Sequence, residues 1–205
     1  NQISFDIPKG KVVGIVGESG SGKSMTSLTI MRLLSENARV INGSIMFEGR
    51  DLLTLKDKEM QALRGNEISM IFQEPMTSLN PVIKIGKQVG ESLRLHTQLN
   101  QNDIDLKVIE ALESVGLPDP EVLMNKYPYQ LSGGMRQRVM IAMASICQPK
   151  LLIADEPTTA LDVTVQLQIL KLLRKFHDET GTSILFISHD LRVIRAVCDE
   201  VIVMY

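Results

Sequence analysis

A glycine-rich stretch near the start of the chain has the residue types that bind a phosphate chain. Residues 17–24 fit the P-loop pattern G-x-x-x-x-G-K-[ST]. Its glycines let the backbone curl so that successive N–H groups point at an anion. In this pattern Lys23 reaches the β- and γ-phosphates, and the hydroxyl of Ser24 holds Mg²⁺. The residues predicted to bind the phosphates of a nucleotide are Gly17, Glu18, Ser19, Gly20, Ser21, Gly22, Lys23 and Ser24.

The residues on either side of this turn supply the elements that the pattern requires. An apolar run over 12–16 precedes the turn and predicts a buried strand, and a helical pattern follows from Met25 to Leu34. That helix would place the positive end of its dipole at the turn. The alternative is a Gly/Ser-rich turn that contains Lys-Ser by coincidence, and the flanking strand and helix argue against it.

Polar and titratable side chains follow several of the other apolar runs. Gln73, Asp155, Glu156 and His189 each come within two residues of the end of a run of strand length. The strands alternate with helices, which predicts a parallel sheet that binds ligand at the carboxyl ends of its strands. We therefore expect these side chains to meet beside the glycine-rich turn.

The chemistry of these residues suits the hydrolysis of a phosphate ester. Asp155 follows four apolar residues, the Walker B arrangement in which the carboxylate holds Mg²⁺, and Glu156 is placed to position or deprotonate the attacking water. His189 could hydrogen-bond a γ-phosphate oxygen and the water, and Gln73 could contact Mg²⁺ or water. Taken singly, each residue also has an ordinary explanation in a turn, a loop or the start of a helix.

A second glycine-rich element lies at 131–135, where Leu-Ser-Gly-Gly-Met leads into a helical pattern. It offers backbone N–H groups and a helix N-terminus to an anion, like the first turn. The plain alternative is an N-cap at Ser132 followed by two glycines. Two phosphate-type loops in one chain would be explained if the second serves a nucleotide held on another subunit.

The remaining pattern is an α/β core interrupted by a helical insertion. Strand-like runs disappear between Val82 and Ile146, and the core resumes at Lys150. Helices are predicted over Lys56–Leu63, Ile85–Leu95, Ile104–Val115, Gly134–Cys147 and Val163–His177. Further strands are predicted over 3–5, 44–48 (beside the P-loop strand), 68–72, 151–154, 183–187 and 201–205.

Bulk properties exclude several classes of protein. The chain has 205 residues and a formal net charge of −2, so no global basic field points to nucleic acid. Cys147 and Cys198 fit no metal spacing and favour free buried thiols in a reducing compartment, although a disulfide is an alternative. No apolar run has the length of a membrane span. The chain begins and stops within strand patterns, which suggests a fragment of a longer protein.

Taken together, the motifs resemble those of the ATP-binding subunits of ABC transporters over the whole chain. Residues 17–24 match Walker A, Gln73 the Q-loop and Leu151–Asp155 Walker B. Leu131–Met135 is similar to the signature L-S-G-G-Q. The resemblance makes Glu156 the catalytic glutamate, His189 the switch histidine, and Ala160-Leu161-Asp162 the D-loop.

A finer resemblance is to the oligopeptide and dipeptide importers, a class whose relatives also carry nickel or glutathione. It rests on Gln73–Pro81, Leu131–Val139 and Ala154–Thr164. Met135 departs from the glutamine of the wider family but suits this class. The resemblance implies an adenine-stacking aromatic residue before residue 1 and a C-terminal extension after Tyr205.

The resemblance implies an α/β fold: a RecA-like P-loop NTPase core with a mainly parallel sheet, a small antiparallel β part and a helical subdomain. One ABC ATPase domain would comprise a core at about 1–81 and 148–205 and a helical subdomain at about 82–147. ATP and Mg²⁺ are the implied ligands, with Mg²⁺ held by Ser24, Gln73 and Asp155. Two domains would face each other head to tail, so that Ser132, Gly133 and Gly134 meet the partner's ATP.

The implied partners are a homologous ATPase subunit, integral membrane permease subunits and, indirectly, a substrate-binding protein, without nucleic acid. The implied location is peripheral, on the cytoplasmic face of the inner membrane. Rival interpretations are an ABC-type ATPase of a DNA-repair or translation machine, a regulatory subunit without turnover, and an unrelated P-loop kinase or GTPase. The first would show coiled-coil heptads or a basic face, the second would lack Glu156 or His189, and the third has no use for residues 131–135.

Overall fold

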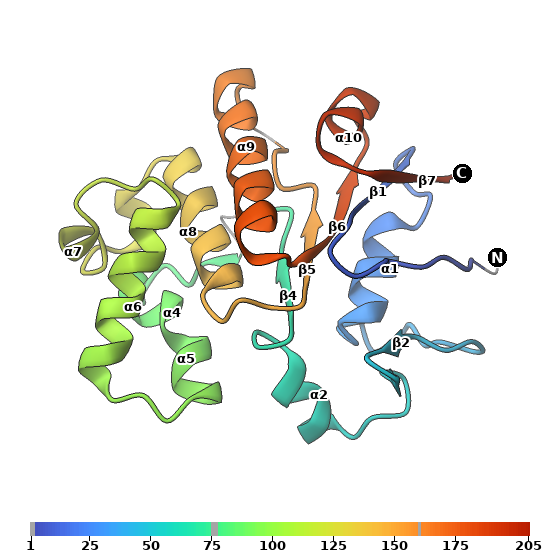
Figure 1. Ribbon diagram of the computed structural model, residues 1–205, viewed down its shortest axis with the longest axis horizontal. Coiled ribbons are helices and arrows are strands. Elements are labelled where there is room, and N and C mark those ends of the chain that lie inside the picture. The colour runs from blue at the N-terminus through green and yellow to red at the C-terminus, as the bar shows by residue number, and fades with distance from the viewer. Residues whose placement is uncertain (1–2, 75–77, 160) are drawn as a thin grey trace.

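A computed structural model describes residues 3–74, 78–159 and 161–205, and its centre is a five-stranded sheet (Figure 1). The strand order is β4-β5-β6-β1-β7, and every neighbouring pair runs parallel. The strands are β1 (Val12–Gly17), β4 (Ile68–Ile71), β5 (Leu151–Asp155), β6 (Ser183–Ser188) and β7 (Glu200–Met204). This parallel sheet with helices between its strands confirms the predicted α/β fold.

The second sheet is a short antiparallel hairpin, in which β2 (Met46–Phe47) pairs with β3 (Arg50–Asp51). The predicted small antiparallel part of the fold is therefore present. The pattern at 44–48, however, predicts one longer strand beside the P-loop strand, and that prediction is wrong. Glu48 and Gly49 have φ of 48° and 75°, the left-handed geometry of a tight hairpin turn, so the chain reverses there.

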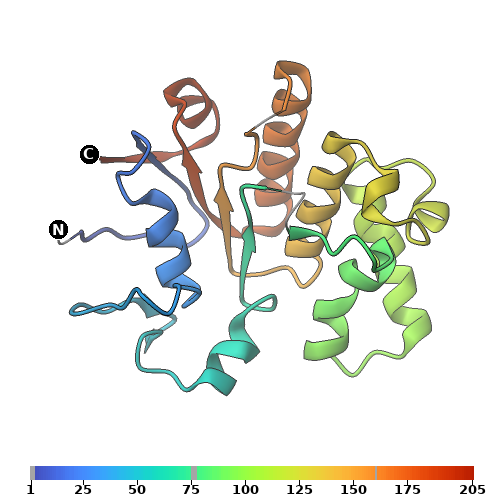
Figure 2. The ribbon, with the colours of Figure 1, turned by 180° about the vertical axis from the view of Figure 1, so that it is seen from behind.

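Helices cover both faces of the central sheet. On one face lie α9 (Val163–Thr180) and α10 (Leu191–Val197) (Figure 1). Figure 2, from behind, shows α1 (Lys23–Ile30) on the opposite face, and α2 (Asp57–Leu63) packs into the same core cluster. Within the described ranges, every helix falls short of the length and apolar character needed to cross a lipid bilayer.

The alternation of side chains along the strands explains these two layers. Val12 and Val16 of β1 join the core cluster that includes α9 and α10, whereas Val13 and Ile15 join the cluster that includes α1 and α2. The residues of β5 and β6 divide in the same way. Because both faces are covered, these strands are continuously apolar in sequence, as is typical of buried parallel strands.

The helices between β4 and β5 form a group beside the sheet (Figure 1). They are α4 (Ile85–Val89), α5 (Glu91–His96), α6 (Gln101–Ser114), α7 (Pro120–Leu123) and α8 (Gly133–Ser145), with a 3₁₀ turn at Pro128–Gln130. The apolar spacing predicts one helix over 85–95, but the structure has two that meet at Gly90. A Cβ at Gly90 would lie 2.9 Å from Cγ2 of Ile104, so the glycine permits close packing against α6.

Other predictions about the ends and the cysteines have mixed outcomes. The strand predicted over 201–205 is confirmed as β7, but the strand predicted over 3–5 is absent. Phe5 and Ile7 pack against the core instead, so the alternation of apolar residues here reflects burial and not hydrogen bonding to a neighbouring strand. Cys147 and Cys198 are free thiols, as favoured by the sequence, but each is only half-buried. Burial raises the pKa of Cys198 to about 12, which keeps this thiol protonated.

Candidate nucleotide-binding site

The glycine-rich turn over 17–24 connects β1 to α1. Gly20 and Gly22 have φ of 87° and 96°, a region that residues with a Cβ rarely adopt. Gly22 directly precedes α1, and the helix begins at Lys23. The first N–H groups of a helix have no partner within the helix, so the turn presents donors and a positive dipole end to an anion.

The start of the turn is held against the last strand of the sheet. Gly17 lies beside Met204 in the β1–β7 register. A Cβ at Gly17 would lie 2.1 Å from the carbonyl oxygen of Met204 and 2.8 Å from Oγ of Ser21. A larger residue at Gly17 would therefore push the turn away from β7.

Lys23 lies folded over the turn and is only 5% exposed. Its Nζ donates hydrogen bonds to the carbonyl oxygens of Gly17 (2.9 Å) and Glu18 (2.8 Å). An ammonium group has three N–H donors, so one is left for a phosphate oxygen. Among the described residues, Oγ of Ser21 is one of the buried polar atoms without a hydrogen-bond partner. A buried ammonium, an unpaired hydroxyl and a helix N-terminus in one turn fit a phosphate group.

Asp155 ends β5 beside the first turn of α1. Its Oδ1 accepts a hydrogen bond from Oγ of Ser24 and its Oδ2 accepts one from Oγ of Ser27, each at 3.2 Å. Burial raises the pKa of the Asp155 carboxyl above its ordinary value, and the two serine hydrogen bonds oppose that rise. The described residues contain no group of three His, Cys, Asp or Glu that could hold a metal alone. Ser24 and Asp155 fit Mg²⁺ all the same, because proteins hold this ion with one or two carboxylates plus substrate phosphates.

The carboxylate of Glu156 is the point where three loops meet. Its Oε2 lies 3.3 Å from Nε2 of Gln73, 3.2 Å from Nδ1 of His189 and 2.8 Å from Oγ1 of Thr159. Gln73, Glu156 and His189 follow β4, β5 and β6, which are neighbours in the sheet. Glu156 has a φ of 46°, and its N–H donates to the carbonyl oxygen of Ile187 at 3.0 Å, which helps to hold this uncommon backbone conformation.

The second glycine-rich element opens α8. Ser132 is the N-cap, and its Oγ accepts a hydrogen bond from the N–H of Met135 at 3.3 Å. Gly133 and Gly134 form the first turn of the helix, and a Cβ at Gly134 would lie 3.1 Å from Cγ1 of Val165 in α9. Within the described parts of the chain, no hydrogen bond or ion pair connects these residues to the turn over 17–24.

Asp162 of the predicted D-loop is the N-cap of α9, and its Oδ1 accepts a hydrogen bond from the N–H of Val165 at 3.0 Å. The Cβ position of Gly134 faces the side chain of the same valine, so Val165 links the start of α9 to the start of α8. Ala160 of the predicted D-loop and residues 75–77 of the segment after Gln73 lie outside the described residues.

Two polar contacts at the site were not predicted from the sequence. Ser27 lies one helical turn after Ser24 and reaches the same carboxylate, which the i, i+3 spacing on α1 could have indicated. Thr159 lies three residues after Glu156, and the intervening Pro157 is a signal for the turn that brings them together.

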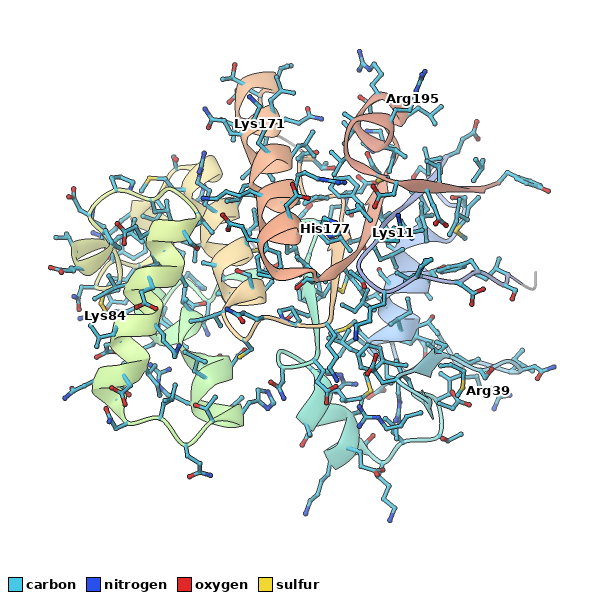
Figure 3. All side chains as sticks on the ribbon, in the orientation of Figure 1. Lys11, Arg39, Lys84, Lys171, His177 and Arg195 are labelled. Carbon is cyan, nitrogen blue, oxygen red and sulfur yellow. The ribbon has the colours of Figure 1, made fainter. Side chains whose placement is uncertain are left out.

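The other two histidines, His96 and His177, lie in ordinary surroundings. Nδ1 of His177 is 2.8 Å from the carbonyl oxygen of Thr182, near the end of α9 (Figure 3). His96 is the last residue of α5 and is half-buried. Among the described residues, neither histidine makes a hydrogen bond or ion pair with Gln73, Glu156 or His189, so both fit structural positions.

The sheet order, the glycine turn before α1 and the carboxylates after β5 together define a P-loop nucleoside-triphosphate-binding domain. A model of the protein family described as ABC transporter matches residues 1–159, and the chain belongs to this family.

Similar sequences include transport proteins of bacteria. The chain is 54% identical to an oligopeptide transport ATP-binding protein of Bacillus subtilis, over 99% of this chain and 57% of that protein. It is 52% identical to a dipeptide transport ATP-binding protein of the same organism, over 99% of this chain and 61% of the relative. An oligopeptide transport ATP-binding protein of Salmonella typhimurium is 52% identical, over 100% of this chain and 61% of its own length. The chain thus spans about three fifths of these relatives.

Similar solved structures include dimeric cassettes. One is a post-hydrolysis dimer of an ATP-binding cassette bound to ADP and Pi, with a TM-score of 0.85 and 30% sequence identity, over 98% of this chain and 83% of that chain. Another is cbiO1 from Clostridium perfringens, part of the ABC transporter complex cbiONQ, with a TM-score of 0.82 and 29% identity, over 98% of this chain and 76% of that chain. Both similarities extend across the sheet and the helical group.

Proposed function

We propose that this chain is the ATP-hydrolysing domain of an ABC importer for oligopeptides, dipeptides or a related small solute. The observation that carries the proposal is the position of Glu156, held by Gln73 and His189 at the strand ends that adjoin the phosphate turn. The importer class is supported by the names of the relatives and by the segments around residues 131 and 154.

Phosphate binding is assigned to the turn over 17–24. Its N–H groups and the remaining donor of Lys23 offset the negative charge of the triphosphate, and burial of Lys23 strengthens that attraction. Ser24, Asp155 and Gln73 would hold Mg²⁺, which when bound neutralises charge on the β- and γ-phosphates. Of these, Ser24 and Asp155 are already in contact, whereas Gln73 contacts Glu156.

Hydrolysis is assigned to Glu156, which accepts a proton from the attacking water as the water approaches the γ-phosphate. His189 faces the same carboxylate and supplies a hydrogen-bonding group at the developing charge. Gln73 lies at the end of β4, where the helical group begins, so its contact with Glu156 connects the state of the site to that group.

The signature residues Ser132, Gly133 and Gly134 are assigned to a second copy's nucleotide. They carry donors suited to an anion but make no polar contact with their own chain's phosphate turn among the described residues. In a head-to-tail pair each ATP would lie between one turn and the partner's signature, with Asp162 at the same interface. The pair would close on ATP and open after hydrolysis, because hydrolysis removes the bridging charge.

The surrounding assembly follows from this assignment. The chain would form one ABC ATPase domain, with its core at about 1–81 and 148–205 and its helical subdomain at about 82–147. The helical subdomain and Gln73 would pass the movement to integral membrane permease subunits, and a substrate-binding protein would deliver the solute. We place the domain peripherally on the cytoplasmic face of the inner membrane, without a nucleic-acid partner.

The variant Glu156→Gln tests the function. It removes the proton-accepting carboxylate and keeps the shape, so we expect ATP turnover to fall at least about 100-fold while ATP-bound pairs accumulate. ATPase assays and size-exclusion chromatography with ATP measure the two effects. Glu110→Gln, the same change on the exposed surface of α6, is the matched control. Unmodified turnover in Glu156→Gln would refute the assignment.

A further inference from the structure

We propose that Thr159 is a positioning residue that fixes the carboxylate of Glu156 in its reactive orientation. The inference rests on the proposed function, because it concerns the same carboxylate. It adds a residue whose role does not depend on contacts from another loop.

Thr159 and Glu156 are joined twice within one tight turn. The N–H of Thr159 donates to the carbonyl oxygen of Glu156 at 3.1 Å, and its Oγ1 donates to Oε2 of Glu156 at 2.8 Å. The second bond is the shortest of the three that reach this oxygen. Pro157 lies between the two residues and restricts the backbone of the turn.

This local contact differs from the two that come from other loops. Gln73 and His189 reach Glu156 from the ends of β4 and β6, and the side chain of His189 is 62% exposed. Either contact is lost if its loop moves relative to β5. The hydroxyl of Thr159 belongs to the same turn as the carboxylate, so it keeps its place when the neighbouring loops rearrange.

The two carboxylate oxygens of Glu156 have different surroundings. Oε2 accepts from Thr159 and faces Gln73 and His189, whereas Oε1 has no hydrogen-bond partner among the described residues. A carboxylate held through one oxygen presents the other in a fixed direction. Oε1 is therefore the oxygen assigned to accept the proton of the attacking water. Thr is suited to this task because its β-branched side chain restricts χ1 and so aims the hydroxyl.

Thr159→Val tests the inference, because it keeps the shape of the side chain and removes the hydroxyl. We expect kcat for ATP hydrolysis to fall about tenfold, equivalent to about 1.4 kcal/mol, with KM for ATP changed by less than about twofold. KM is spared because, within the described parts of the chain, Thr159 makes no hydrogen bond to the phosphate turn. Thr159→Ser should restore kcat to within about threefold of the unmodified protein.

A matched control is Thr158→Val, the same chemical change one residue earlier. The hydroxyl of Thr158 has no hydrogen-bond partner among the described residues, so its loss should leave kcat unchanged. Thermal unfolding midpoints of all variants should agree with that of the unmodified protein. In a Glu156→Gln background, Thr159→Val should cause no further loss, because the two residues act as a unit.

The outcomes distinguish this inference from the proposed function. If Glu156→Gln loses turnover while Thr159→Val keeps the unmodified kcat, the role of Thr159 is refuted and the proposed function stands. The inference also fails if Thr159→Ser is as impaired as Thr159→Val, because the hydroxyl would then not be the cause. Unmodified rates in both Glu156→Gln and Thr159→Val would overturn the proposed function itself.

Discussion

The substitution Lys23→Ala gives the sharpest test of the phosphate turn. Two of the three ammonium N–H groups are bound to the carbonyl oxygens of Gly17 and Glu18, which leaves one for the ligand. A hydrogen bond to a charged group contributes about 1.5–3 kcal/mol. At about 1.4 kcal/mol per tenfold change, Lys23→Ala should raise the Kd for ATP about 10- to 150-fold.

Isothermal titration calorimetry with ATP and Mg²⁺ measures this change in Kd. Lys11→Ala is the control, because Lys11 (labelled in Figure 3) is exposed and lies just before the same strand, outside the residues of the turn. The ATP affinity of Lys11→Ala should match that of the unmodified protein. Thermal unfolding without nucleotide checks that Lys23→Ala is folded. We expect the midpoint to fall by only about 2–4 °C, because water can reach the two released carbonyl groups.

The reasoning fails if Lys23→Ala is folded and binds ATP with an affinity within about twofold of the unmodified protein. A large drop in the unfolding midpoint with unchanged affinity would mean that Lys23 serves only to hold the turn together. An equal loss of affinity in Lys11→Ala would point to a general electrostatic effect instead of a specific bond.

Two further predictions concern the carboxylates. Asp155→Asn should lower the ATPase rate and raise the Mg²⁺ concentration for half-maximal rate at least about tenfold. The reason is that a neutral amide oxygen is a weaker magnesium ligand than a carboxylate. An unchanged magnesium titration would show that Asp155 does not bind the metal. Asp199 accepts a hydrogen bond from the N–H of Val12 and one from Arg174, and these, Val12 first, hold its pKa below the usual range. The ionised form therefore stabilises the fold above the unfolded pKa of about 4, and the contribution disappears as pH falls through the lower folded pKa. Because Asp199 is exposed and solvent screens its interactions, urea unfolding of Asp199→Asn should show a loss of unfolding free energy of less than about 1 kcal/mol at pH 7. That loss should shrink toward pH 3, and an equal loss at both pH values would contradict the assignment.

The central sheet could be predicted because its signals are local and redundant. The strands β5 and β6 are buried on both faces, so their apolar runs are continuous and each ends at a polar residue. The turn before α1 could also be predicted, because phosphate binding requires glycine and lysine at fixed positions of the P-loop pattern, here Gly22 and Lys23.

Predictions failed where tertiary contacts decide the local structure. The periodic run over 85–95 predicts one helix, but close packing of α6 against Gly90 divides it. The reversal at Glu48 depends on a residue type that tolerates left-handed geometry only rarely, so the hairpin gave a weak signal. The strand predicted over 3–5 is absent, because Phe5 and Ile7 pack against the core without pairing to another strand.

The convergence of Gln73, Glu156 and His189 could be predicted, because each residue follows a strand of the same parallel sheet. The contact of Thr159 with Glu156 could not, because it depends on the form of a turn that strand and helix periodicity do not encode.

The position of β1 in the sheet has a consequence for folding during synthesis on the ribosome. β1 is formed by residues 12–17, yet its two neighbours are β6 and β7, formed by residues 183–204. Contacts between such distant segments form late and slowly. During synthesis, residues 12–17 cannot pair until residues 183–204 have been made, and until then this apolar segment is open to aggregation or to binding by a chaperone. A ribosome-bound intermediate that lacks residues 183–204 would therefore leave β1 unpaired, and ATP could stabilise the domain only after β6 and β7 have joined the sheet.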